Sequence, residues 1–390
     1  MNMYFKLWRN RSFMKLNLSL FLVEFVRGAM LISFIPKFAV NELQLTVAIV
    51  GIAISIHYVF DTLAKMVMGY LLDRYSVRII VSSGLFLSLL GFLIIPAAVN
   101  QPWLFIAVAA IYGLGVSPVW VVCLASITEE DRTSQSGFLY AIWLVGLGLG
   151  SFLINFFIDA HLYTVYWLLT VILGFSWISA FLLTNQKMII QNQLTLLTQL
   201  QRLWKRIKLL RMLLPGMVLQ SVGASMLVPV LPLFVDQTLH LSAAAYSFMM
   251  LFGGGCAIVG LLTFPKWTKG INKRITLIVG FFGFATSLCL LALATPFPLL
   301  VISTLLLGFS YAAVLPAWNA LLARFVSPSQ AAMGWGAFST VEGLGIMIGP
   351  FIGGLLAAQF NLAVPILLSA CLFGLMGCFY LLWFPKMRNS

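Results

Sequence analysis

The stretch Gly69-Tyr-Leu-Leu-Asp73-Arg74-Tyr-Ser-Val-Arg78 decides the fold, because it stands between two long apolar runs at 46–72 and 78–99. A helix needs about 20 apolar residues to cross roughly 30 Å of hydrocarbon, and both runs are long enough. The basic residues between them belong, by the positive-inside rule, to a loop on the cytoplasmic side of a membrane. This stretch therefore predicts a short basic connection between two transmembrane helices.

The same pattern extends over the whole chain of 390 residues, of which 62% are hydrophobic and only 8% are charged. An ordinary soluble domain is roughly half apolar and about a quarter charged, so lipid must be the solvent for most of this surface. We predict an all-α membrane protein with twelve transmembrane helices in two six-helix bundles. The predicted spans are 14–38, 46–72, 78–99, 103–126, 136–158, 163–184, 212–235, 243–264, 275–294, 297–322, 332–358 and 362–385.

The net charge of +13 is distributed loop by loop. The basic residues precede the first span, follow the last, and fill the loops that come after even-numbered spans, and only Arg27, Lys37 and Lys65 lie elsewhere. A nucleic-acid patch would not alternate in this way, so we expect no nucleic-acid partner. The positive-inside rule predicts a multi-pass protein of the cell membrane with both termini in the cytoplasm.

The longest polar interval, residues 185–211, divides the chain into an N-terminal half, 1–184, and a C-terminal half, 212–390. Leu and Ile recur in it at helical spacing between Arg and Lys, which predicts an amphipathic linker helix on the cytoplasmic membrane surface. Two six-span halves joined by such a loop are the plan of major facilitator transporters, whose substrate site lies near the midplane between the halves.

The loop at Gly69–Arg78 also resembles the signature of that superfamily, Gly-x-Leu-x-Asp-Arg followed by a basic residue. Gly69 permits close helix approach, Asp73 can cap a helix end, and Arg74 and Arg78 can pair with it. The resemblance implies a loop that takes part in conformational change. The alternative is a solvated loop that only satisfies the positive-inside rule.

Two further patterns concern helix geometry. Pro229-Val-Leu-Pro232 should bend the seventh span. Gly345, Gly349 and Gly353 in the eleventh span are small residues at helical spacing, which we interpret as a helix-packing surface.

Ionisable residues inside the first two spans are the strongest functional signal. Glu24 and Arg27 are three residues apart in span 1, and His57, Asp61 and Lys65 recur every four residues in span 2. A charge at the bilayer centre costs at least about 2.5–3.5 kcal/mol on insertion scales, so such groups usually pair and face a cavity. They could couple transport to protons or hydrogen-bond sugar hydroxyls, and the alternative is an ion pair that only orders the two helices.

Interior aromatic residues suggest a substrate pocket. Trp120 and Trp143 could stack on the apolar face of a sugar or could simply fill the core, and Leu315-Pro-Ala-Trp318-Asn319 adds a polar and aromatic stretch in span 10. Glu342 is the one C-terminal acid expected within the membrane. A charged N-terminal half combined with an apolar C-terminal half suits an amphiphile with a polar head group and acyl chains.

At these residues the chain resembles a narrower family, the proton-coupled glycolipid flippases of lipoteichoic acid synthesis in Gram-positive bacteria. The resemblance rests on segments from both halves: Glu24-Phe-Val-Arg27-Gly28, Ser55-Ile-His57 with Asp61, Ser117-Pro-Val-Trp120, Trp143, Leu227-Val-Pro-Val-Leu-Pro232, and Leu315-Pro-Ala-Trp-Asn319 with Ala323-Arg324-Phe325.

The resemblance implies a proton-coupled antiporter that flips a diacylglycerol-linked disaccharide from the inner to the outer leaflet. It assigns head-group binding and proton coupling to Glu24, Arg27 and Asp61, with His57 as a further member, and a polar pocket to Trp120 and Trp143. Lys65 and Glu342 depart from the pattern, because neutral polar residues are expected there.

Two other functions remain open at this point: a proton-driven exporter of drugs or sugars with the same fold, and a membrane-embedded enzyme or sensor. The sequence has no metal-ligand cluster, nucleophile elbow or nucleotide loop, so we expect no enzyme, no metal and no cofactor. The expected partners are the glycolipid substrate, protons and membrane lipids, and the expected state is a monomer.

Overall fold

The computed structural model describes residues 11–127, 132–159, 161–186, 214–267, 273–293, 296–322 and 331–387. The chain divides into two compact units, Met1–Leu196 and Leu197–Ser390, each of which is described by itself. The predicted linker at 185–211 lies almost wholly outside the described residues.

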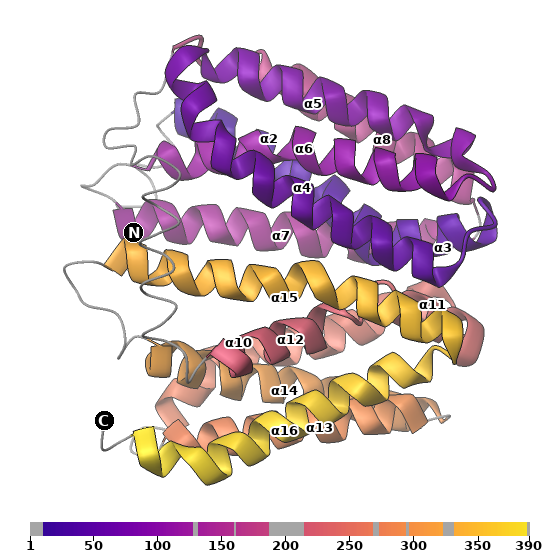
Figure 1. Cartoon of the computed structure of the whole chain (residues 1–390), viewed down its shortest axis with the longest axis vertical. Helices are drawn as coiled ribbons and strands as arrows, with labels where there is room; N and C mark the ends of the chain where they lie inside the picture. The colour runs from indigo at the N-terminus through magenta and orange to yellow at the C-terminus, as the bar shows by residue number, and fades with distance from the viewer. Residues whose placement is uncertain are drawn as a thin grey trace. The chain divides into compact units, whose positions relative to one another are not determined.

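The N-terminal unit is a bundle of long helices, drawn from indigo to magenta in Figure 1. Its first span is continuous helix, with a π-helical segment between two α-helical segments. In chain order the elements are α2 (Arg11–Gly28), the π-helix η1 (Ala29–Phe34), α3 (Ile35–Asn41), α4 (Val47–Arg74), α5 (Val77–Ile94), the 3-10 turn η2 (Ile95–Ala98), α6 (Pro102–Ala125), α7 (Arg132–Ile158) and α8 (Leu162–Ala180).

The C-terminal unit is also a bundle of long helices, drawn toward yellow in Figure 1. Its elements are α10 (Leu214–Ser225), α11 (Leu231–Leu233), the π-helix η3 (Phe234–Thr238), α12 (Ala243–Trp267), α13 (Lys273–Leu293), α14 (Phe297–Leu322), α15 (Ala331–Gln359) and α16 (Ala363–Met387).

Within the described part of the chain, 11 helices are long and apolar enough to cross a membrane. The remaining predicted span, the seventh at 212–235, is broken into α10, a turn and the short α11 with η3. Proline has no N–H to donate and its ring obstructs the preceding turn, so Pro229 and Pro232 explain the break. The predicted bend of this span is confirmed.

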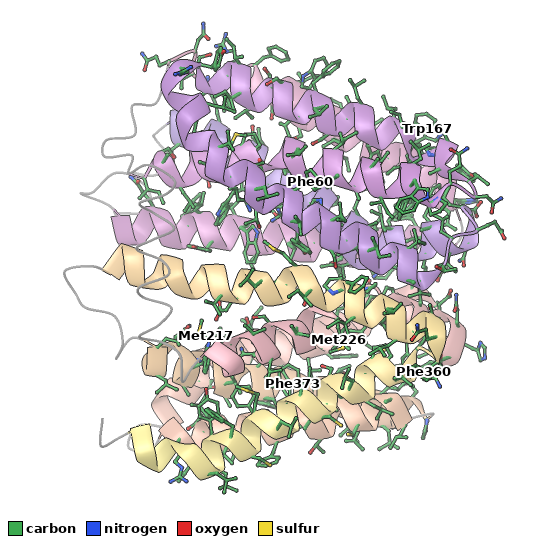
Figure 2. All side chains as sticks on the ribbon, viewed as in Figure 1. Phe60, Trp167, Met217, Met226, Phe360 and Phe373 are labelled. Atoms are coloured by element: carbon green, nitrogen blue, oxygen red, sulfur yellow. The ribbon has the colours of Figure 1, made fainter. Side chains whose placement is uncertain are left out.

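Large apolar side chains project outward from both units, as Figure 2 shows for labelled residues such as Trp167 and Phe360. Trp167 is 56% exposed and Phe360 is 67% exposed. A soluble monomer rarely exposes apolar patches of this extent, whereas lipid accepts them. Together with the span count, this exposure makes the chain a multi-pass membrane protein.

Glycines hold pairs of helices in backbone contact in each unit. On α7, a Cβ added at Gly146 would lie 3.0 Å from the carbonyl oxygen of Phe21, and one at Gly150 would collide with that of Phe25 on α2. Gly148, on another face of α7, has open space. In the C-terminal unit Gly345 and Gly349 of α15 press in the same way on α10, and Gly353 presses on the backbone of Met226, the residue that follows α10. The packing role predicted for these span 11 glycines is confirmed.

Candidate functional site

Helices α2 and α4 bring four ionisable side chains into one cluster, which we call the charged cluster: Glu24, Arg27, Asp61 and Lys65. Arg27 Nη2 lies 2.9 Å from Glu24 Oε2, and Arg27 Nη1 lies 3.7 Å from Asp61 Oδ2. Lys65 Nζ donates to the same Asp61 Oδ2 at 2.6 Å. Two acids and two bases therefore form one connected network across the two helices.

The charged cluster is buried at one end and accessible at the other. Glu24 and Asp61 are 2% and 3% exposed, whereas the side chain of Lys65 is 29% exposed. Taking a charge out of water costs several kcal/mol per ion, which mutual attraction offsets only when charges are matched. The balanced composition of the cluster explains how four such groups persist in mid-span, and Lys65 marks where solvent or a ligand can reach them.

Local helix geometry places each member. Glu24 and Arg27 are separated by three residues and Asp61 and Lys65 by four, so each pair lies on one helical face. Gly146 of α7 admits α2, since a Cβ there would be 3.1 Å from Glu24 Cβ. Gly113 of α6 admits α4, because its missing side chain leaves room for the backbone at His57.

His57 lies one turn from Asp61 but is fully buried. Its ring stacks on Tyr112 at a centroid distance of 5.3 Å and meets Tyr58 edge-on, also at 5.3 Å. Neither of its ring nitrogens forms a hydrogen bond with a side chain of the charged cluster. A cavity of about 10 Å³ beside it is at the lower limit for a single water. His57 therefore packs behind the charged cluster in this conformation, and its part in head-group binding stays a prediction.

The two predicted pocket tryptophans come together on α6 and α7. The rings of Trp120 and Trp143 are 6.2 Å apart and tilted by 54°. Tyr140 meets Trp120 edge-on at 5.4 Å and completes an aromatic group that the sequence analysis missed. The spacing of Tyr140 three residues before Trp143 on one helix is the signal that could have revealed it.

In the C-terminal unit, Trp318 and Glu342 form a pair of their own. Trp318 is 2% exposed, and its Nε1 donates to Glu342 Oε1 at 3.3 Å. Tyr380 meets the Trp318 ring edge-on at 6.1 Å. The neighbouring Asn319 is exposed rather than packed in this group. Trp318 thus packs inside its own bundle, where its indole N–H stabilises a carboxylate.

The loop that follows α4 is tied to the end of the sixth span. Arg78 Nε donates to the carbonyl oxygen of Leu183 at 3.0 Å, and Ser76 Oγ donates to Asn185 Oδ1 at 2.8 Å. Arg74 is exposed at the end of α4. The surroundings of Gly69 and the side chain of Asp73 lie outside the described set, so their predicted roles stay predictions.

All three basic residues that lie away from the basic loops have acidic partners. Arg27 and Lys65 belong to the charged cluster, and Lys37 of α3 donates to Asp159 Oδ1, beyond the end of α7, at 2.7 Å. Lys37 is only 4% exposed. This second buried cation was visible in the sequence, but its partner, 122 residues away, was not.

Comparison with known proteins identifies relatives over nearly the full length. The sequence model of the Major Facilitator Superfamily matches residues 16–214 and 213–389. A Staphylococcus aureus protein named proton-coupled antiporter flippase LtaA is 30% identical over 387 residues, covering 98% of this chain and 97% of its own. The protein of the same name from Staphylococcus saprophyticus is 31% identical and covers 98% of this chain and 96% of its own.

Solved structures with a similar fold include the nucleoside transporter NupG, with a TM-score of 0.78, 15% identity, and coverage of 96% of this chain and 99% of that one. A bacterial homologue of the iron transporter ferroportin has a TM-score of 0.71 and 13% identity, with coverage of 96% and 98%. At these identities the likeness concerns the fold alone.

Proposed function

The chain belongs to the Major Facilitator Superfamily, and we propose that it is a proton-coupled antiporter that flips a diacylglycerol-linked disaccharide glycolipid from the cytoplasmic to the outer leaflet. Two relatives that it matches over nearly its whole length are named proton-coupled antiporter flippases. The proposed role is that of a transporter in the cell membrane rather than an enzyme, with both termini in the cytoplasm.

The charged cluster is the observation that carries this proposal. Intramembrane ionisable residues are expensive and mark proton relays and substrate pathways in transporters. Here Arg27 contacts both carboxylates, and Asp61 Oδ2 also accepts from the partly exposed Lys65. A change at any one member therefore alters the hydrogen bonds of the others.

The same connectivity supplies a coupling mechanism. The ionised carboxylates of Asp61 and Glu24 can accept hydrogen bonds from sugar hydroxyls, and a proton that binds either carboxyl removes an acceptor and so weakens head-group binding. When the head group binds, its hydroxyls stabilise the ionised carboxylates, and the proton is expelled. Proton and head group then compete for one network, which is the requirement for antiport.

Aromatic residues and the division of charge support the choice of a glycolipid. The tilted pair Trp120 and Trp143, with Tyr140, offers flat apolar surfaces of the kind that stack on sugar rings. In the C-terminal unit, Glu342 is the acid that the described helices place in mid-span beside Trp318. A largely apolar second bundle suits acyl chains.

The deciding experiment measures flipping of a fluorescent diacylglycerol-linked disaccharide by the purified protein in proteoliposomes, with and without a proton gradient. We expect gradient-dependent flipping by the wild type and its loss in Asp61→Asn and Glu24→Gln. Glu42→Gln is the matched control, because Glu42 caps the end of α3 outside the charged cluster, and it should flip at the wild-type rate.

Two results would contradict the proposal. Wild-type, gradient-dependent flipping by both variants would remove the two carboxylates from the mechanism. Proton-driven movement of a soluble drug or sugar, with no flipping of the glycolipid, would favour the alternative of a major facilitator exporter.

A further inference from the structure

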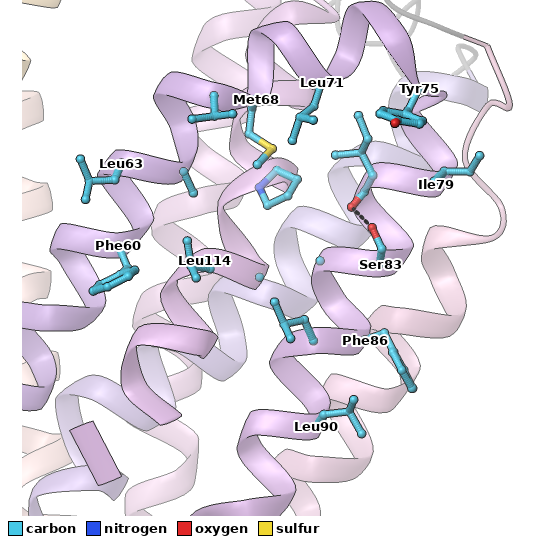
Figure 3. A pocket seen from close by; sticks show the side chains of 17 residues that line it. Phe60, Leu63, Met68, Leu71, Tyr75, Ile79, Ser83, Phe86, Leu90 and Leu114 are labelled. Atoms are coloured by element: carbon cyan, nitrogen blue, oxygen red, sulfur yellow. Dashed lines mark hydrogen bonds between the residues drawn. The ribbon is translucent and has the colours of Figure 1, made fainter. Parts of the chain in front are cut away.

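A long apolar groove runs along the N-terminal unit beside the part of α4 that carries Asp61 and Lys65, although neither of these residues lines it. We call it the α4–α5 groove (Figure 3). It has a volume of about 940 Å³. One wall is formed by α4 from Phe60 onward with the following residue Tyr75, the other by α5 from Ile79 to Leu90, and the floor by the segment of α6 at Leu114, Gly115 and Pro118. This volume lies within the range of about 300–1,000 Å³ typical of ligand pockets.

Packing on α6 explains why the groove exists. Gly84 of α5 lies directly on Gly115, and a Cβ at Gly84 would be 3.0 Å from Pro118 Cγ. Gly113 lets α4 approach the same helix on the other side. Because both walls pack onto α6 rather than onto each other, a space remains between them.

The lining is almost entirely hydrocarbon. The hydroxyl of Ser83 donates to the carbonyl oxygen of Ile80 at 3.1 Å, so it presents no free donor to the groove. The rim is open, with Leu63 51%, Val67 46% and Leu87 41% exposed. Such a surface binds a flexible apolar chain and offers little to a polar ligand.

The length of the groove matches one leaflet. At about 1.5 Å per residue, the walls from Phe60 to Tyr75 and from Ile79 to Leu90 are about 22 Å and 16 Å long. Half of a typical hydrocarbon core is about 15 Å. The groove therefore spans the depth that the acyl chains of a single leaflet occupy.

Two basic residues stand next to one end of the groove in the sequence, although neither lines it. Tyr75 and Ile79 line that end, and the exposed Arg74 and the half-buried Arg78 stand beside them in the sequence. Tyrosine is enriched where a membrane meets water, and basic side chains attract anionic lipids there. The proposed orientation places this end at the cytoplasmic surface, whose leaflet carries the anionic lipids.

We propose that the α4–α5 groove holds an acyl chain of an anionic phospholipid from the cytoplasmic leaflet, with its phosphate against Arg74 and Arg78. The occupant differs from the proposed substrate, whose disaccharide head group is neutral. Ala64 and Met68, which line the groove, each follow a charged-cluster residue, Asp61 or Lys65, by three positions on α4. A bound lipid thus supports the helix that carries half of the cluster. The inference rests on the orientation given under the proposed function.

The test is photocrosslinking of the purified full chain with phosphatidylglycerol that carries a photoreactive acyl chain, in nanodiscs of neutral lipid. Phosphatidylcholine with the same chain is the comparison. We expect phosphatidylglycerol to label peptides from α4 and α5 preferentially. Arg74→Gln and Arg78→Gln should each weaken that labelling about fivefold, as expected for the loss of one basic residue near an anionic surface.

A substitution that fills the groove provides a second test, with a matched control variant. Val67→Trp puts a large side chain into the groove, whereas Val171→Trp makes the same change at a similarly exposed position on α8, 52% against 46%. Only Val67→Trp should abolish groove labelling.

Equal labelling by both lipids, or labelling spread evenly over the helices, would overturn the proposal, as would unchanged labelling of Val67→Trp. The measurement uses neither a proton gradient nor a glycolipid. Its failure would therefore leave the flippase proposal standing, and failure of the flipping assay would leave the groove intact.

Discussion

Replacing Arg27 with glutamine removes the base that contacts both carboxylates of the charged cluster. Lys65 still compensates Asp61 at 2.6 Å, but Glu24, 2% exposed, loses its partner at 2.9 Å. An uncompensated carboxylate in mid-span costs about 3 kcal/mol. Glu24→Gln should lower the free energy of unfolding by less, because Arg27 keeps its ion pair with Asp61 at 3.7 Å. The double variant removes acid and base together, so it should recover most of the loss seen in Arg27→Gln.

A double-mutant cycle measures this directly. Unfolding free energies of the wild type, the two single variants and the double variant in one detergent should give a coupling energy of about 3 kcal/mol. The same cycle on Lys37 and Asp159 is the control, because the carboxylate there is 39% exposed and solvent screens the pair. We expect a clearly smaller coupling for that pair. Additive effects within about 0.5 kcal/mol at Glu24 and Arg27 would refute the interpretation of a buried, charge-balanced network.

Three further predictions concern single positions. Gly150→Ala should clearly lower the melting temperature, because the added Cβ would collide with the backbone of α2. Gly148→Ala on the same helix has open space for the Cβ and should leave the melting temperature unchanged. Equal effects of the two substitutions would contradict the packing described. Lys65→Met should slow glycolipid flipping, because Asp61 loses the hydrogen bond that Lys65 Nζ donates at 2.6 Å. Lys65→Arg keeps a donor and should retain more activity. A fully active Lys65→Met variant would exclude the lysine from coupling. Glu342→Gln keeps an acceptor for the Trp318 indole, so it should fold normally, and a changed proton dependence of flipping would show that this acid titrates during transport.

The sequence predicted the helices well because its signals were strong and local. Runs of apolar residues ended at polar or proline-containing breaks, and the observed boundaries, such as Val47–Arg74 for 46–72 and Phe297–Leu322 for 297–322, lie within about four residues of the predicted ones. The break in the seventh span followed from two prolines. By contrast, the π-helix Ala29–Phe34 has an ordinary apolar sequence, so no residue indicated it.

The candidate site was predictable only in part. Charges at helical spacing identified Glu24 with Arg27 and Asp61 with Lys65, because each pair depends on one helix alone. The contact between Arg27 and Asp61, the packing of His57 between tyrosines, and the bond from Lys37 to Asp159 depend on how separate helices meet. The α4–α5 groove arises from glycines on a third helix, which no apolar pattern reveals.

Backbone contact at Gly146 and Gly150 has a mechanical consequence. Helices that touch through their main chains cannot separate by rotation of side chains, so α2 and α7 should move as one rigid pair. Gly113 joins α4 to α6 as a second rigid pair. The ion pair between Arg27 and Asp61 connects the two helix pairs, and its 3.7 Å separation is the longest in the charged cluster. A small movement of one helix pair against the other would change the distance between Arg27 and Asp61 before it broke the shorter contacts of the network. We therefore expect this distance to vary during the transport cycle.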